Sequence, residues 1–136
     1  ITLNDWHETH WARGHNAQGK PTSNWDLPTL AGAGAIRSNT QDMLKYIAAN
    51  INNQLAFEQT HQPRKAFGEN AKVGLAWIQS ESNNGETVLW HNGGTGGFRT
   101  YSGFVKEKGL GVVVLSNTAV SVDEIGFLIL DYLAEE

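Results

Sequence analysis

From Lys72 onward, the sequence alternates short runs of strand-forming residues with short turn-forming segments, and this pattern limits the fold more than any other feature. Four runs have the composition of strands, over 72–80, 87–91, 98–105 and 110–117. Turns of about two to six residues join them, whereas a parallel pairing needs a crossover of a dozen or more. The sequence therefore predicts an antiparallel meander of about four strands between residues 72 and 117.

The last of these runs is apolar without alternation from Leu110 to Leu115. A strand with one face in water alternates apolar and polar residues, so an unbroken apolar run predicts burial on both faces. The meander therefore needs other elements to cover it.

A helix is predicted over 39–53. Ser38 followed by Gln41 fits a capping box, and Asp42 suits the positive end of the helix dipole. The apolar residues recur at helical spacing and form one stripe: Met43, Leu44, Ile47 and Ile51.

A second helix is predicted over 121–134, where Ser121 and Glu124 fit another capping box. Its apolar stripe is read as Ile125, Leu128, Ile129 and Tyr132. Two helices packed on an antiparallel sheet give an α+β layer fold.

The rest of the chain has weaker patterns. Residues 1–30 are expected to be irregular and open to mobility, except for a short strand over 10–15. Residues 54–70 are expected to hold a short helix followed by a loop. The length of 136 residues predicts a single domain, 1–136.

Composition excludes several classes of function. The formal net charge is −4 and the pI is about 5.7, so no basic surface for nucleic acid or an anionic membrane is expected. The chain has no cysteine, which excludes disulfides and thiolate ligands within it. No apolar run approaches the ~20 residues of a membrane span.

Two ligand motifs are weak. His7 and His10 form H-x-x-H with His15 nearby, but no third ligand stands at a firm spacing, so surface or packing histidines are the favoured interpretation and no metal is expected. The glycine-rich GGTGG is followed by a strand and not a helix, which argues against a phosphate site.

The stretch WHNGGTGGF, residues 90–98, has two interpretations. One is a glycine-rich hairpin turn over 92–97. The other is a ligand-binding sheet edge, with an imidazole from His91, an amide from Asn92 and uncovered N–H groups at Gly93 and Gly94. Local chemistry alone favours the hairpin.

The wider sequence resembles the serine β-lactamase-like family, which includes class C β-lactamases, D-Ala-D-Ala carboxypeptidases, D-aminopeptidases and related esterases. HNGGTGGFRTYSGFVKEKGLGVVVLSN resembles the block that carries that family's K-T-G or H-x-G motif. LAGAGAIRSNTQDMLKYIAANI, WARGH and VGLAW resemble three further blocks in the family's order. The resemblance covers nearly the whole chain and implies the β-lactamase/transpeptidase-like fold.

Two motifs of that family are missing. No serine in the chain has a lysine three residues later, so S-x-x-K is absent. No tyrosine has an asparagine two residues later, and the formal S-x-N at Ser82–Asn84 lies too close to His91. The resemblance therefore implies a C-terminal fragment of a serine hydrolase whose nucleophile and general base lie upstream, and which is inactive alone.

The resemblance also implies roles for residues of the H-x-G block. Gly94 would supply an oxyanion N–H, and His91 would lie beside the catalytic groups and the substrate. Asn92, Gly93 and Thr95 would bind substrate. No cofactor is implied. The partner would be a β-lactam, a D-Ala-D-Ala-like peptide or an ester, and the location periplasmic or secreted.

Two further points stay open at this stage. H-x-G in place of K-T-G replaces a fixed ammonium with an imidazole. Because H-x-G is commoner in the family's peptidases and esterases than in its class C β-lactamases, the resemblance favours a peptidase or esterase. The alternative function is a non-catalytic module that binds a peptide or cell-wall fragment.

Overall fold

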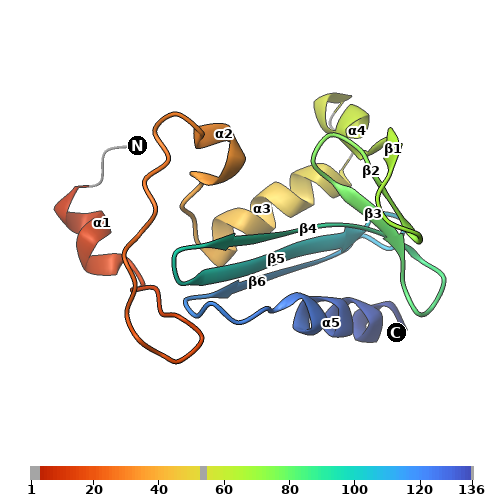
Figure 1. The fold of residues 1–136 in the computed structure, drawn as a ribbon. Helices are drawn as coiled ribbons and strands as arrows, with labels where there is room; N and C mark the ends of the chain where they lie inside the picture. Colours follow the sequence, from red (N-terminus) through yellow and green to blue (C-terminus); the bar gives the residue numbers. More distant parts are fainter. Residues whose placement is uncertain (1–3, 53–54, 136) are drawn as a thin grey trace.

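The computed structural model describes residues 4–52 and 55–135. Its centre is a six-stranded antiparallel sheet whose strands follow in chain order, with α3 on one face and α5 on the other (Figure 1). The helices are α1 (Asp5–His10), α2 (Ala31–Gly34), α3 (Thr40–Ile51), α4 (Leu55–His61) and α5 (Asp123–Glu135). The strands are β1 (Lys65–Ala66), β2 (Ala71–Val73), β3 (Ile78–Glu81), β4 (Thr87–Thr95), β5 (Phe98–Val105) and β6 (Leu110–Ser116).

The antiparallel sheet packed by helices is confirmed, with six strands where about four were expected. The run predicted as one strand over 72–80 is divided into β2 and β3. Between them, Gly74 lies against the carbonyl groups of Thr60 and Gln62, where a side chain has no room, and Ala76 adopts a φ of 71°. The short helix predicted within 54–70 is α4, but β1 takes the place of part of the loop.

The beginning of α3 differs from the predicted capping box. Asn39 is the N-cap, and its Oδ1 accepts a hydrogen bond from the Asp42 N–H over 3.0 Å. The helix therefore starts one residue later than the Ser38–Gln41 pairing requires. Residue 53, the last of the predicted helix, lies outside the described residues.

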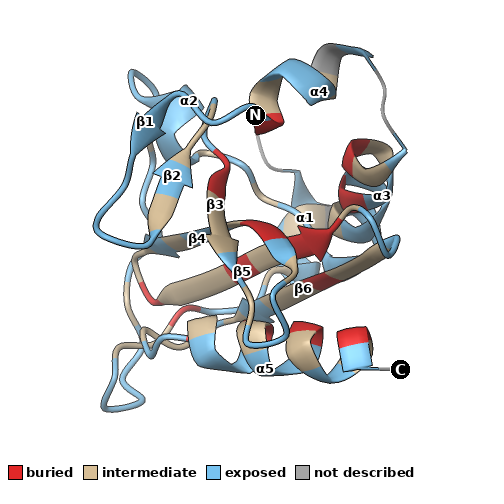
Figure 2. Ribbon diagram, turned by 90° about the vertical axis from the view of Figure 1, so that its right-hand side faces the viewer, coloured by how far each residue is buried: buried red, intermediate tan, exposed pale blue. Residues whose placement is uncertain are grey.

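Two apolar clusters hold the sheet to its helices, one on each face (Figure 2). On the α3 side, Ile47, Trp77, Leu89 and Phe104 are buried together. On the α5 side, the buried set is Val88, Tyr101, Val105, Val112, Val122 and Leu130. In β6, Val113 packs on the first cluster and Val112 belongs to the second, as the unbroken apolar run predicts.

The apolar stripe predicted for α5 is wrong. The residues that the helix buries are Gly126, Leu130 and Ala134. Gly126 lies directly against the ring of Tyr101, so the small residues allow the helix to approach the sheet closely. The four predicted core residues are 40% to 66% exposed: Ile125, Leu128, Ile129 and Tyr132. α5 starts at Asp123 and not at 121, and Ser121 Oγ accepts from the Asp123 N–H over 3.3 Å instead of from the Glu124 N–H that the predicted capping box requires.

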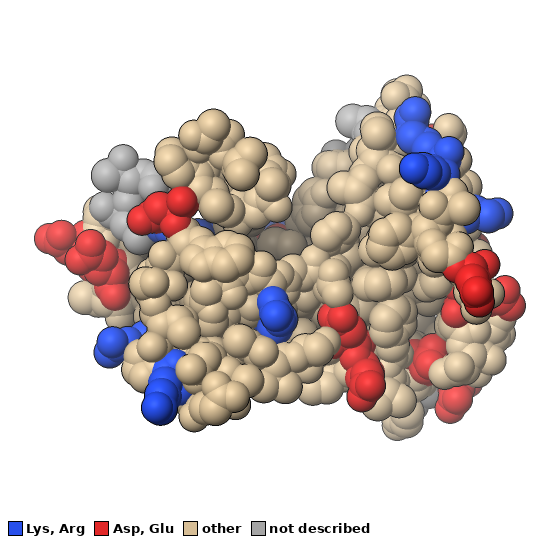
Figure 3. Space-filling view, in the orientation of Figure 1, with Lys and Arg blue, Asp and Glu red and all other residues tan. Residues whose placement is uncertain are grey.

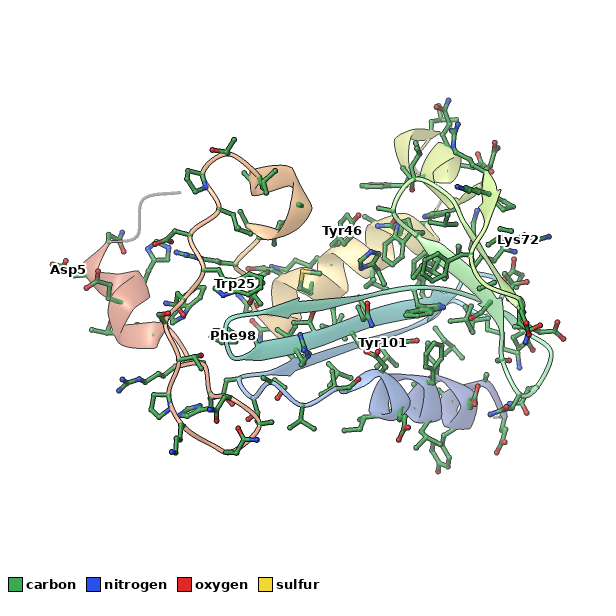
Figure 4. All side chains as sticks on the ribbon, in the orientation of Figure 1. Asp5, Trp25, Tyr46, Lys72, Phe98 and Tyr101 are labelled. Carbon is green, nitrogen blue, oxygen red and sulfur yellow. The ribbon has the colours of Figure 1, made fainter. Side chains whose placement is uncertain are left out.

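The strand predicted over 10–15 is also wrong, because α1 ends at His10 and only His15 makes isolated bridges. The segment that follows α1 wraps the end of the β4–β5 hairpin. The His15 N–H donates to the Gly97 and Asn117 carbonyls over 3.2 and 2.9 Å. Trp25 lies beside the same hairpin, close to Phe98 (Figure 4). Among the described residues, no helix is long and apolar enough to cross a membrane.

A buried histidine links α4 to the α3 side of the core. His61 is 8% exposed and its Nε2–H donates to Asn50 Oδ1 over 2.9 Å, while its Nδ1 has no hydrogen-bond partner among the residues that the structure describes. The ring contacts Trp77 and Phe104, with centroids 6.2 and 5.3 Å apart. Burial lowers the pKa of His61, the positive charge of Lys106 lowers it further, and Glu58 opposes both.

The stability of the fold is therefore expected to fall as the pH drops below about 6.5, the usual pKa of histidine. Because the folded state resists protonation of His61 and the unfolded state does not, protons favour unfolding in the window between the two pKa values. The contribution is at most about 1.4 kcal/mol per pH unit. Urea unfolding at pH 7.5 and pH 5.5 measures it, and His61→Gln should flatten the difference. An unchanged pH dependence in that variant would contradict the prediction.

Candidate active site

The glycine-rich stretch is mostly strand and not turn. β4 runs through the predicted turn residues as far as Thr95, and only Gly96 and Gly97 connect it to β5. Gly97 has a φ of 79°, a conformation that suits glycine. The prediction of a turn over 92–97 is therefore wrong in extent, because the turn is only residues 96 and 97. Residues 92–95, the stretch also interpreted as a sheet edge, belong to β4.

Beyond Trp90, β4 has a free edge. β3 pairs with β4 only from Thr87 to Trp90, and on that side residues 91–95 have no partner strand in the described parts of the chain. Thr95 and Phe98 close a two-residue hairpin and so bond to each other. Because backbone groups alternate along an antiparallel strand, the N–H and C=O groups of Asn92 and Gly94 point away from β5 and toward the free edge.

The side chains of the H-x-G motif have definite partners. His91 and Asn92 are exposed, and His91 Nδ1 lies within hydrogen-bond distance of the Asn92 carbonyl. Asn92 Nδ2 donates to Asp123 Oδ2 over 2.7 Å, which ties the strand to the first residue of α5. A side chain at Gly93 would come within 2.6 Å of Thr100 Oγ1. All five residues predicted for the site, His91 to Thr95, therefore lie along this one edge.

A hollow of about 370 Å³ adjoins the edge on the α5 side. Its lining is Asn92, Gly93, Gly94, Arg99, Ser121 and Asp123. Of these lining residues, Arg99, Ser121 and Asp123 were not predicted from the sequence as part of the candidate site. Arg99 faces Gly94 across the hairpin, and this pairing follows from the sequence only when the turn is read as two residues instead of six.

The molecule is visibly notched between the lobe that contains α1 and α2 and the lobe that contains α4 and β1 to β3 (Figure 3). β4 runs beneath this notch (Figure 1).

A second hollow, of about 380 Å³, is lined by Phe67, Trp90, Phe127 and Asp131 among others, and by none of residues 91–95. Asp131 in that hollow already accepts a bond from Asn83 over 2.6 Å. The 370 Å³ hollow is therefore the one that shares residues with the predicted site.

The histidines of the H-x-x-H motif lie elsewhere. His7 and His10 are on α1, and His15 Nδ1 lies 3.2 Å from the Asn117 carbonyl. Within residues 4–52 and 55–135, no group of three His, Cys, Asp or Glu side chains is placed to hold a metal ion.

A family model described as "Beta-lactamase" matches residues 4–132. The chain belongs to the beta-lactamase family. Solved members share the fold. A class C beta-lactamase superposes with a TM-score of 0.83 at 23% identity, over 97% of this chain and 46% of that one. A D-alanine carboxypeptidase from Burkholderia cenocepacia gives 0.83 at 22% identity, over 96% and 49%.

Two further proteins are similar to this chain, one in its structure and one in its sequence. The beta-lactamase/D-alanine carboxypeptidase from Pseudomonas syringae has a TM-score of 0.81 at 22% identity, over 98% of this chain and 47% of that one. The unguisins hydrolase of Aspergillus campestris is 27% identical over an alignment of 124 residues, which covers 80% of this chain and 22% of that protein. The chain thus spans about half the length of its structural relatives and less of this curated one.

Proposed function

We propose that the chain forms one wall of the active site of a serine hydrolase that works through an acyl-enzyme on an amide, ester or β-lactam carbonyl. The observation that carries the proposal is the free edge at residues 91–95, where Gly94 directs its N–H outward. Membership of the beta-lactamase family supports the reaction class.

In this proposal, a serine on the upstream part attacks the substrate carbonyl, and an upstream base takes the serine proton. The carbonyl oxygen becomes an oxyanion, which receives hydrogen bonds from the Gly94 N–H and from the nucleophile's own N–H. One such donor contributes roughly 3 kcal/mol in the transition state. The leaving group then departs with a proton, and water hydrolyses the acyl-enzyme.

The neighbouring residues have supporting roles. Gly93 keeps the edge free of side chains, so an extended substrate lies close to the backbone. Asp123 uses one N–H of the Asn92 amide, so the other N–H and Oδ1 remain for the substrate. His91 and Thr95 lie at the two ends of the free edge. Because side chains alternate along a strand, these two point to the same face of β4.

The chain by itself is expected to show no turnover of nitrocefin or p-nitrophenyl acetate, because neither S-x-x-K nor Y-x-N is present in it. A full-length form that carries an upstream S-x-x-K should hydrolyse at least one of them. Spectrophotometric assays of both forms measure this, with the upstream serine changed to alanine as the control. Turnover by the chain alone would contradict the proposed division of the site, and binding without turnover by the full-length form would favour a non-catalytic module.

A further inference from the structure

The second hollow, of about 380 Å³, is large enough to hold a small organic molecule. It lies between the first strands of the sheet and α5. Phe67 and Glu81 come from the β1–β3 end, Trp90 from β4, and Phe127 and Asp131 from α5. Elements far apart in the sequence therefore build this hollow together, and the proposed reaction does not use it.

Three aromatic rings form the apolar part of its wall. Phe67 is 51% exposed, and Trp90 and Phe127 are half-buried. Trp90 is fixed in place, because its Nε1–H donates to Ser80 Oγ over 3.0 Å and its ring stacks on Tyr101 with centroids 6.1 Å apart. The Phe127 ring meets the Trp90 ring at 74°, with centroids 5.0 Å apart. Rings that are already held lose little conformational freedom when a ligand binds.

Both charged side chains in the wall are acidic. Asp131 Oδ2 accepts from Asn83 Nδ2 over 2.6 Å, and the charge of the carboxylate is not paired with a cation. Glu81 is exposed and forms no hydrogen bond or ion pair with any other residue that the structure describes. Nearby in the sequence, Glu86 already pairs with Lys108 over 3.2 Å. The serine and asparagine side chains of the wall are neutral and can donate or accept, so it is the net charge that distinguishes one ligand class from another.

We infer that this hollow binds a small organic cation, an ammonium group carried on an apolar body. The face of an aromatic ring is negative, so it attracts a cation that comes within about 6 Å of the ring centre. The two carboxylates attract the same charge. An anion would be repelled, and a neutral molecule would gain only the apolar contact. The inference is independent of the proposed function and is unaffected if that function is refuted.

Three benzyl compounds of similar size test the inference: benzyltrimethylammonium, benzyl alcohol and phenylacetate. Each is titrated into the 136-residue chain and followed by ¹H–¹⁵N NMR, with the Trp90 indole N–H and the Asn83 side-chain amide as reporters. The cation should bind about 3- to 30-fold more tightly than the alcohol, and phenylacetate more weakly than either. Equal affinity for the cation and the alcohol, or no saturation by the cation below roughly 10 mM, would overturn the inference.

Variants separate the carboxylates from the rings. Glu81→Gln combined with Asp131→Asn removes the charges and keeps the shape, so it should weaken the cation by about 3- to 10-fold and leave benzyl alcohol within about twofold. Phe67→Ala, at an exposed side chain, should weaken both ligands. Glu8→Gln makes the same chemical change at an exposed position on α1 and should alter neither. Unchanged affinity for the cation in the double variant, or an equal loss for cation and alcohol, would also overturn the inference.

Discussion

Replacing Gly94 with proline is expected to lower the kcat of the full-length enzyme by about 100- to 1000-fold relative to Gly94→Ala. Proline removes the N–H proposed as the oxyanion donor. Because this N–H faces the free edge, the substitution removes no hydrogen bond to β5. Both variants place a side chain where Arg99 Nη1 lies, so the alanine variant controls for displacement of the guanidinium. Steady-state kinetics on p-nitrophenyl acetate measures the ratio.

The neighbouring glycine gives the matched control for stability. The Gly93 N–H faces β5, so Gly93→Pro should destabilise the sheet in urea unfolding, whereas Gly94→Pro should do so much less. A kcat for Gly94→Pro within about threefold of that for Gly94→Ala would reject Gly94 as a donor in the transition state.

Phe104→Ala is expected to lower the free energy of unfolding by about 3–5 kcal/mol. Phe104 is fully buried, and its ring centroid lies 5.0 Å from Trp77 and 5.3 Å from His61. The substitution therefore removes the group at which the sheet, the α4 end and the α3 side of the core meet. Since small domains have only about 5–15 kcal/mol of stability, this loss is a large fraction of the total. Urea denaturation followed by tryptophan fluorescence measures the change.

Phe67 offers the same chemical change at a surface position, because its side chain is 51% exposed. Phe67→Ala should cost less than about 1 kcal/mol. Phe104→Leu keeps the measurement possible if Phe104→Ala does not fold. Its loss of unfolding free energy should lie between those of Phe104→Ala and Phe67→Ala. Equal losses from Phe104→Ala and Phe67→Ala would contradict the central place of Phe104 in the core.

The sequence predicts those elements best whose pattern is repeated along the chain. The β4–β5–β6 meander follows from strand-forming runs separated by short turn-forming segments, and α3 follows from helical spacing. The α5 stripe could not be predicted in this way, because the helix is apolar on several sides and its packed face is chosen by shape. Gly126 and Ala134 are poor hydrophobic signals, yet the helix buries both, and Gly126 lies against the ring of Tyr101.

The site illustrates the same limit. His91, Asn92 and Gly94 were identified from residue type and from resemblance, but glycine content predicted a long turn where the chain continues as a strand. Glycine is typical of turns, and tertiary contacts decide whether it forms one. Because the strand was predicted to end at residue 91, the pairing of Gly94 with Arg99 and the hydrogen bond from Asn92 to Asp123 could not be inferred.

The segment that wraps the hairpin tip connects folding with reactivity. Gly14 lies against Gly96, and the His15 N–H holds the Gly97 carbonyl, so the two-residue turn is supported from outside the sheet. A donor that is already fixed when negative charge develops does not have to reorganise, and this preorganisation is the main source of its effect. A substitution of Gly14 or His15 that loosens the tip is therefore expected to slow the proposed reaction, although it changes none of the residues of the proposed site.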